Sequence, residues 1–345
     1  KVIQDIVEKY LVREKKVIPS ARSLQFAGKA AELESARMYN CSFSHANRPD
    51  FFSQLFYLLL AGCGVGYSGQ KRHISQLPVL AKIDPSQVAY MGIDDSIAGW
   101  ADSVGDLILS YMDPYAECYG KYVEYDYTSI RRKGLPLKTS GGKAPGHIPL
   151  KLMLEKIRVI LDKAQGRQLT SLEAHDICCH IAEAVLAGGI RRSSLICLFD
   201  NDDELMLTCK TGDWMKGNQQ RRMANNSAVF LRGKDEDKDR FIKLFDYMKA
   251  YGEPGFFFTN DLDHGCNPCG EINLCPVHPG TFEVGFQMCN LTEINGKKIK
   301  TREDFIKVAK AAAFIGTLQA SYTYFPYLGR VPEEIWRHEA LIGVG

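Results

Sequence analysis

Apolar residues recur at helical spacing in several parts of this chain. Between Val2 and Leu11 they stand three and four positions apart, which predicts an amphipathic helix. The same periodicity predicts four further helices, at residues 49–61, 149–164, 171–187 and 302–320. The chain is therefore expected to contain a large helical component.

Short runs rich in β-branched and aromatic residues lie between these helices. They occupy residues 193–199, 226–231 and 255–259 and are bounded by Gly, Asn and Asp. Strands that alternate with helices predict an α/β fold with parallel strands. The final "LIGVG" also reads as a strand, because it is apolar and β-branched.

Two glycine-containing segments interrupt this pattern. In "AGCGVGYSG", the glycines at 62, 64, 66 and 69 predict a tight turn or a close approach of two backbones. The segment "RRKGLPLKTSGGKAPGH", residues 131–147, predicts an extended loop. It is a candidate anion site, and a solvated loop is the alternative.

Composition narrows the class of protein. The 345 residues suit one large domain or two, and 45% hydrophobic with 24% charged residues is typical of a folded protein with a sizeable core. A net charge of +2 gives no basis for a nucleic-acid or membrane partner. With no apolar run of about 20 residues and no signal peptide, the expected location is cytoplasmic.

The chain has eleven cysteines, an odd number without a secretory signal, which predicts free and mostly buried thiols. Three of them, Cys266, Cys269 and Cys275, crowd into "GCNPCGEINLCP" at 265–276. A zinc knuckle would need a second pair of ligands. A thioredoxin-like CxxC normally opens a helix, whereas this one reads as a loop. Buried structural thiols are the third interpretation.

A fourth interpretation uses the neighbouring polar residues. Residues two apart on extended backbone point to the same side, so Asn267, Cys269 and Glu271 could face one substrate. A thiol, a carboxylate and an amide on one face form a set suited to chemistry. No resident metal ion is expected here.

The segments "NPCGEI" and "CNLTEIN" resemble the finger loop and following strand of ribonucleotide reductase catalytic subunits, most of all the adenosylcobalamin-dependent class. Further matches occur in order along the chain. They are "PSAR" (19–22), "NCSF" (40–43), "GCGVGYS" (62–68), "DDSIAGW" (94–100), "IRRKGLPLKTSGG" (130–142), "GGIRRSS" (188–194), "RRMANNSAVF" (221–230) and "GEPGF" (252–256).

The resemblance implies a ten-stranded α/β barrel made of two five-stranded halves, with the finger loop in its centre. The second half would be incomplete in this chain. One catalytic barrel domain is expected over residues 1–345, without an N-terminal ATP cone. Its parts would be an N-terminal helical part at about 1–60, an effector and dimer region at about 90–145, and the finger loop at about 260–290.

The resemblance also implies catalytic roles. A thiyl radical on Cys269 would take the 3′ hydrogen of a ribonucleotide, Glu271 would accept the 3′-hydroxyl proton, and Asn267 would bind the sugar hydroxyls. Cys41 and Cys289 would reduce the radical intermediate and end as a disulfide. Cys266 and Cys275 match no role in the family and are expected to be structural.

Substrate and effector contacts follow in the same way. The residues that match the substrate side are Ser20, Asn40, Arg221, Asn225 and Asn226. The residues that match the deoxynucleoside triphosphate effector site are Asp95, Ser96, Arg131 and Lys138. Arginine forks suit phosphate oxygens. As an alternative, Asp95 would simply cap the helix that follows it.

The implied function is reduction of ribonucleotides to deoxyribonucleotides for DNA synthesis, with adenosylcobalamin as cofactor. The implied partners are a dithiol or thioredoxin-like reductant, the effector and a second copy in a homodimer. Two alternatives stay open. One is an inert nucleotide-binding or scaffolding fragment that needs a second chain to complete the barrel; the other is a large subunit of the diiron-dependent class.

Overall fold

The computed structural model describes residues 1–137, 142–187, 194–234, 238–332 and 341–344. These residues form two compact units. We call residues 44–275 the central unit, and residues 1–43 with 276–345 the flanking unit. The expectation of a single barrel domain remains a prediction.

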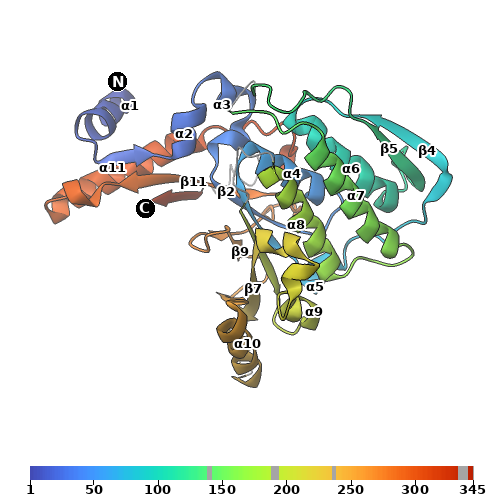
Figure 1. Ribbon diagram of the computed structural model, residues 1–345. Helices are drawn as coiled ribbons and strands as arrows, with labels where there is room; N and C mark the ends of the chain where they lie inside the picture. The colour runs from blue at the N-terminus through green and yellow to red at the C-terminus, as the bar shows by residue number, and fades with distance from the viewer. Residues whose placement is uncertain (138–141, 188–193, 235–237, 333–340, 345) are drawn as a thin grey trace. The chain divides into compact units, whose positions relative to one another are not determined.

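A parallel sheet forms the centre of the central unit (Figure 1). Its strands are all parallel and lie in the order β3 (Gly64–Ser68), β6 (Leu195–Asp200), β7 (Ala224–Leu231) and β8 (Gly255–Thr259). The three strands predicted from the sequence are β6, β7 and β8. The α/β prediction with parallel strands is therefore confirmed.

Helices pack together beside this sheet. They are α4 (Phe51–Ala61), α6 (Ile97–Met112), α7 (Ile148–Lys163) and α8 (Ser171–Ala187). Helix α4 contacts α6 and α8, and α7 contacts α8. Every residue of α4 except Leu60 is buried, which explains why its sequence is apolar on all sides.

The glycine-rich segment after α4 combines a turn with a strand. Gly62 has a φ of +90° and ends α4 in the left-handed conformation that glycine favours. The next residues then form the buried strand β3, which the sequence did not predict as a strand. Glycine weakens strand propensity, and only close packing against another segment explains its presence here.

Smaller elements complete the central unit. They are α5 (Lys71–Ile74), the parallel pair β4 (Asp84–Gly92) and β5 (Lys121–Asp126), α9 (Glu204–Thr208), α10 (Lys238–Tyr251), and the antiparallel pair β9 (Gly265–Cys266) and β10 (Asn273–Leu274). Strand β5 and the end of β4 fall in the region that the resemblance assigns to the effector.

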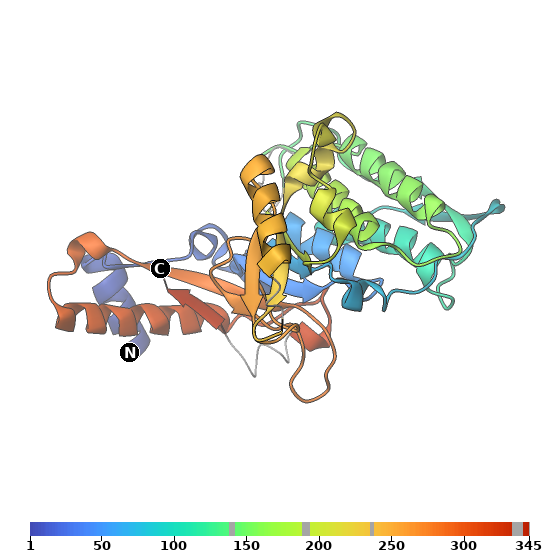
Figure 2. The same cartoon turned by 90° about the horizontal axis from the view of Figure 1, so that it is seen from below.

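The flanking unit is organised around β11 (Gln287–Ile294). This strand pairs antiparallel with β1 (Val17–Pro19) and β2 (Cys41–His45), and parallel with β12 (Leu341–Val344). Strand β12 confirms the strand predicted in "LIGVG". Figure 2 shows helix α11 (Arg302–Ala320) running alongside β11.

A small apolar core holds α11 in place. Val17 of β1 packs with Val308, Ala312 and Ile315 of α11, and all four are buried. The predicted first helix is also present, as α1 (Val2–Ile6) followed by a π-helical segment, Val7–Arg13. Among the described residues, every helix is too short or too polar to span a bilayer.

Candidate active site

Residues 265–274 form a hairpin that carries the predicted catalytic loop. Its two short strands, β9 and β10, pair Cys266 with Asn273. At the tip, the Gly270 amide donates a hydrogen bond to the Asn267 carbonyl oxygen at 2.9 Å, and Gly270 has a φ of +80°. The tip is therefore a tight turn in which position 270 favours glycine.

This turn corrects one step of the sequence argument. Asn267, Cys269 and Glu271 do not lie on extended backbone, so the rule that alternate residues face the same side does not apply. Asn267 is fully buried, whereas Cys269 and Glu271 are exposed. The proline and glycine of the motif favour a turn, because proline fixes φ and glycine tolerates positive φ.

The hairpin crosses strand β3 at very short range. A Cβ atom placed on Gly66 would lie 1.9 Å from the Cys266 carbonyl oxygen, and one on Gly64 would lie 3.2 Å from Cγ of Pro268. No side chain fits at position 66 while the hairpin keeps this position. The close backbone approach predicted for these glycines is confirmed.

The two ends of the Asn267 side-chain amide differ in their hydrogen bonding. Its Oδ1 accepts a hydrogen bond from the Ile272 amide at 3.1 Å. Its Nδ2 is buried and has no hydrogen-bond partner among the described residues. A buried donor without a partner is costly. The arrangement therefore suits a ligand that offers an oxygen acceptor.

The two thiols of the CxxC sequence have different surroundings. Cys269 is exposed at the turn, whereas Cys266 is only 2% exposed. Burial, and to a lesser extent the nearby Glu271 carboxylate, raises the pKa of the Cys266 thiol to about 12. Cys266 is therefore protonated at neutral pH and unreactive. This agrees with the expectation that it is structural.

A cavity of about 440 Å³ adjoins the hairpin. Glu271 and Gly270 line it together with Arg232, Phe257 and Phe258, among others. Its volume falls within the range of small-molecule sites, about 300–1,000 Å³. Its lining is mostly polar and includes Asp261 and His264 as well as Arg232 and Glu271, so it suits a polar ligand.

In the flanking unit, Cys41 of β2 stands directly opposite Cys289 of β11. The Asn40 amide donates a hydrogen bond to the Cys289 carbonyl oxygen at 3.1 Å, next to this pair. Both thiols are buried, and they are not joined in a disulfide. The structure thus brings together two cysteines that the resemblance pairs.

The other residues matched to the substrate in this unit have structural contacts. Ser20 caps helix α2 (Ala21–Phe26), since its Oγ accepts from the Ser23 amide at 3.1 Å. Its own amide donates to Oε1 of Gln319 at 3.1 Å. Asn40 retains a buried Oδ1 with no partner among the described residues, so it keeps a polar atom available for a ligand.

On the central unit, Arg221 is engaged by the protein itself. Its Nε and Nη2 each donate to the Asp176 carboxylate at 2.7 Å, and Nη1 donates to the Cys209 carbonyl oxygen at 2.9 Å. Asn225 is exposed on β7, whereas Asn226 is buried, and no described residue forms a hydrogen bond with its Oδ1. Asn225 is therefore more accessible to a substrate than Arg221.

Three of the four residues matched to the effector, Asp95, Ser96 and Arg131, lie close together. Arg131 donates from Nε to Oδ2 of Asp95 at 2.6 Å. Ser96, rather than Asp95, caps helix α6, because its Oγ accepts from the Gly99 amide at 3.0 Å. The alternative in which Asp95 caps that helix is wrong. Lys138 lies outside the described residues.

One cluster was not found by sequence reasoning. His45, His73 and Asp263 of the central unit each place a metal-binding atom within 4.8 Å of the others. They come from three separate segments and follow no ligand motif. No signal in the sequence could have joined them.

Known proteins were compared with the chain as a whole. No family model matches it. An adenosylcobalamin-dependent ribonucleoside-triphosphate reductase of Lactobacillus delbrueckii subsp. bulgaricus is 29% identical over 85% of this chain and 44% of that protein. A protein of the same name from Euglena gracilis is 26% identical over 96% of this chain and 45% of that protein.

A solved structure gives the fold. The crystal structure of a B12-dependent (class II) ribonucleotide reductase matches with a TM-score of 0.78 and 24% identity, over 95% of this chain and 52% of that one. The predicted reductase fold, incomplete in this chain, is confirmed. The chain spans about half the length of the relatives it matches. It is therefore similar in sequence and in fold to the adenosylcobalamin-dependent ribonucleotide reductases.

Proposed function

We propose that this chain supplies the reducing residues of an adenosylcobalamin-dependent ribonucleotide reductase. The observation that carries the proposal is the register of β2 and β11, which sets the Cys41 and Cys289 thiols opposite each other. Two buried thiols in this position are suited to deliver two electrons and close a disulfide. An inert scaffold has no use for such a pair.

The residues of the 265–274 hairpin would act on the sugar. A thiyl radical on Cys269 would remove the hydrogen atom from C3′, Glu271 would accept the 3′-hydroxyl proton, and the 2′-hydroxyl would leave as water. Cys269 would afterwards return its hydrogen atom to C3′. In balance, one ribonucleotide and two thiols give one deoxyribonucleotide, one water and the Cys41–Cys289 disulfide.

Asn267 would orient the sugar for this step. No residue in the described part of the chain accepts a hydrogen bond from its buried Nδ2, and a hydroxyl oxygen of the ribose would do so. The bond from the Ile272 amide to its Oδ1 fixes the direction of the side chain. Preorganised donors of this kind contribute to catalysis because they need no rearrangement when the substrate binds.

The exposure of Cys269 fits a radical source that is not part of the chain. When bound, adenosylcobalamin supplies a radical by cleavage of its cobalt–carbon bond. The protein's part is to keep the Cys269 thiol accessible at the tip of a tight turn.

Substrate, effector and partners follow from the named relatives and from the resemblance. We propose ribonucleoside triphosphates as substrates, because the relatives are named as triphosphate reductases. A deoxynucleoside triphosphate would bind at Asp95, Ser96, Arg131 and Lys138 in a homodimer. A dithiol or thioredoxin-like protein in the cytoplasm would reduce the disulfide again. If this chain alone is inactive, a second chain that completes the barrel is the partner that it lacks.

Anaerobic turnover tests the proposal. The chain is incubated with adenosylcobalamin, a dithiol, ribonucleoside triphosphates and a deoxynucleoside triphosphate, and deoxynucleotides are measured by chromatography. Product should be lost in Cys269→Ala and largely retained in Cys266→Ala. Equal loss in both variants would contradict the role of Cys269, and no product from the unaltered chain would favour the inert-fragment alternative.

A further inference from the structure

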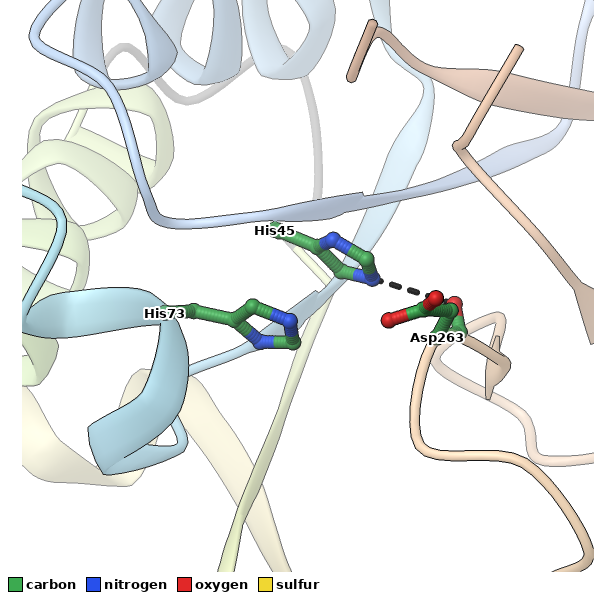
Figure 3. A group of neighbouring side chains, drawn as sticks. All are labelled: His45, His73 and Asp263. Carbon is green, nitrogen blue, oxygen red and sulfur yellow. Dashed lines mark hydrogen bonds between the residues drawn. The ribbon is translucent and has the colours of Figure 1, made fainter. Parts of the chain in front are cut away.

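A compact group of three metal-binding side chains lies in the central unit, apart from the residues assigned to catalysis (Figure 3). His45 is the last residue of β2, His73 belongs to α5, and Asp263 lies between β8 and β9. One ligand atom of each lies within 4.8 Å of the others. Both histidines are only 2% exposed.

We propose that His45, His73 and Asp263 bind one divalent transition-metal ion, with zinc as the reference ion. Two imidazoles and one carboxylate form a donor set that zinc and ferrous iron accept, with further positions left for water. The proposal goes beyond the reductase function, in which the only metal expected is the cobalt of the cofactor.

The surroundings of the histidines support a ligand role. Nδ1 of His73 lies 2.7 Å from Oγ of Ser68, a contact that orients the ring and leaves Nε2 for an ion. A ring held through one nitrogen presents its other nitrogen to a metal in a fixed direction.

Asp263 already contacts one of the histidines. Nε2 of His45 lies 3.0 Å from the Asp263 backbone oxygen, the contact drawn as a dashed line in Figure 3. The two imidazole rings are stacked, with centroids 3.8 Å apart and planes 12° from parallel. An ion would replace the contact with the backbone oxygen and turn the rings so that one nitrogen of each points to the same place.

A nearby cation opposes binding but only weakly. Nη2 of Arg72 lies 3.0 Å from Oδ1 of Asp263, and the two side chains are 42% and 39% exposed. Ion pairs this exposed contribute little to stability. Arg72 can therefore move into solvent when an ion takes its place at the carboxylate.

Binding would have a structural consequence within the central unit. Asp263 precedes the first residue of β9, Gly265, by two positions, so it lies at the base of the hairpin that carries Cys269. An ion would join this base to the end of β2 and to α5. It would restrict the motion of the hairpin without touching the Cys269 thiol.

Calorimetry, in which zinc chloride is titrated into the metal-free chain, tests the proposal. We expect one strong site, with affinity reduced at least about tenfold in His73→Gln and in Asp263→Asn. Asp263 is only half-buried, so its variant is expected to fold, as circular dichroism would check. His147→Gln, which alters a histidine at the start of α7, is the matched control and should bind like the unaltered chain.

Two further measurements separate this site from the thiols. Cys269→Ala should leave the strong site intact, and cobalt substitution should give an absorption spectrum without a thiolate charge-transfer band. Unchanged binding in His73→Gln and Asp263→Asn, or the absence of a strong site in the unaltered chain, would overturn the proposal. Because the assay measures binding alone, its result is independent of whether the chain reduces nucleotides.

Discussion

Cys41 and Cys289 lie directly opposite each other on the antiparallel strands β2 and β11, although 248 residues separate them in the sequence. Residues opposite each other in such a pair have Cα atoms about 4.5–5.5 Å apart. Two cysteines can form a disulfide when their Cα atoms are about 4.4–6.8 Å apart. The fold therefore sets this pair at bonding distance without any change in register.

Mild oxidation should accordingly join Cys41 to Cys289. We expect the linked peptides to appear in a non-reducing digest analysed by mass spectrometry, and the link to disappear in Cys289→Ser. Cys63, which is buried on the other unit, serves as the control and should stay a thiol. Failure to detect the linked peptides after complete loss of both thiols would contradict the register.

The two thiols of the hairpin should differ in their rate of alkylation. Cys269 is exposed and should react quickly with iodoacetamide in the folded protein. Cys266 is buried, and its pKa is raised to about 12, so on the order of one thiol in ten thousand is ionised near pH 8. Its rate should rise as the pH approaches 12. Mass spectrometry of timed samples measures both rates, and equal rates near pH 8 would refute the assignment.

Gly66→Ala should destabilise the protein. The added methyl group would lie 1.9 Å from the Cys266 carbonyl oxygen, so the hairpin must move away from β3. We expect the free energy of unfolding to fall by at least about 2 kcal/mol, as for other severe steric clashes. Gly92→Ala is the control, because no atom lies within 4 Å of the added Cβ. Thermal unfolding of both variants tests this prediction. Equal melting temperatures would argue against the close approach of the hairpin to β3.

Asn267→Ala should reduce activity more than stability. The variant loses one hydrogen bond, from the Ile272 amide, but it also removes a buried Nδ2 that has no partner within the described ranges. We expect a small change in melting temperature and a loss of deoxynucleotide formation of about tenfold or more. Asn47→Ala, which also removes a side-chain hydrogen bond, from Nδ2 to Oε1 of Gln76 at 3.0 Å, is the comparison variant. Full activity of Asn267→Ala would remove this residue from the sugar site.

Arg131→Lys should weaken effector binding. Arg131 approaches Asp95 at 2.6 Å, and lysine keeps the charge but not the fork that suits phosphate oxygens. Equilibrium dialysis with a labelled deoxynucleoside triphosphate should show a several-fold weaker affinity. The same measurement on Arg132→Lys, which alters the exposed neighbour, should show no change. If both variants bind equally well, the effector does not contact Arg131.

Parts of this structure could be read from local sequence patterns. Local patterns of apolar residues predicted the helices α4, α7, α8 and α11 and the strands β6, β7 and β8. Such patterns are visible in the sequence because the residues that bury one face of an element are close together along the chain. Strand β3 was missed since its glycines serve a contact with residues about 200 positions later. The loop around Cys269 was predicted, but the tight turn at Gly270 buries Asn267 and exposes Cys269, which the rule for alternate residues on extended backbone did not predict.

The sequence by itself determined the α/β character, the motif around Cys269 and the likeness to ribonucleotide reductases. Each of these three conclusions depends only on which residues follow one another along the chain. Only the tertiary structure decided that Cys41 faces Cys289, that Arg131 meets Asp95, and that two histidines gather beside Asp263. Such pairs depend on strand register and loop closure over long separations, and no local pattern encodes those distances.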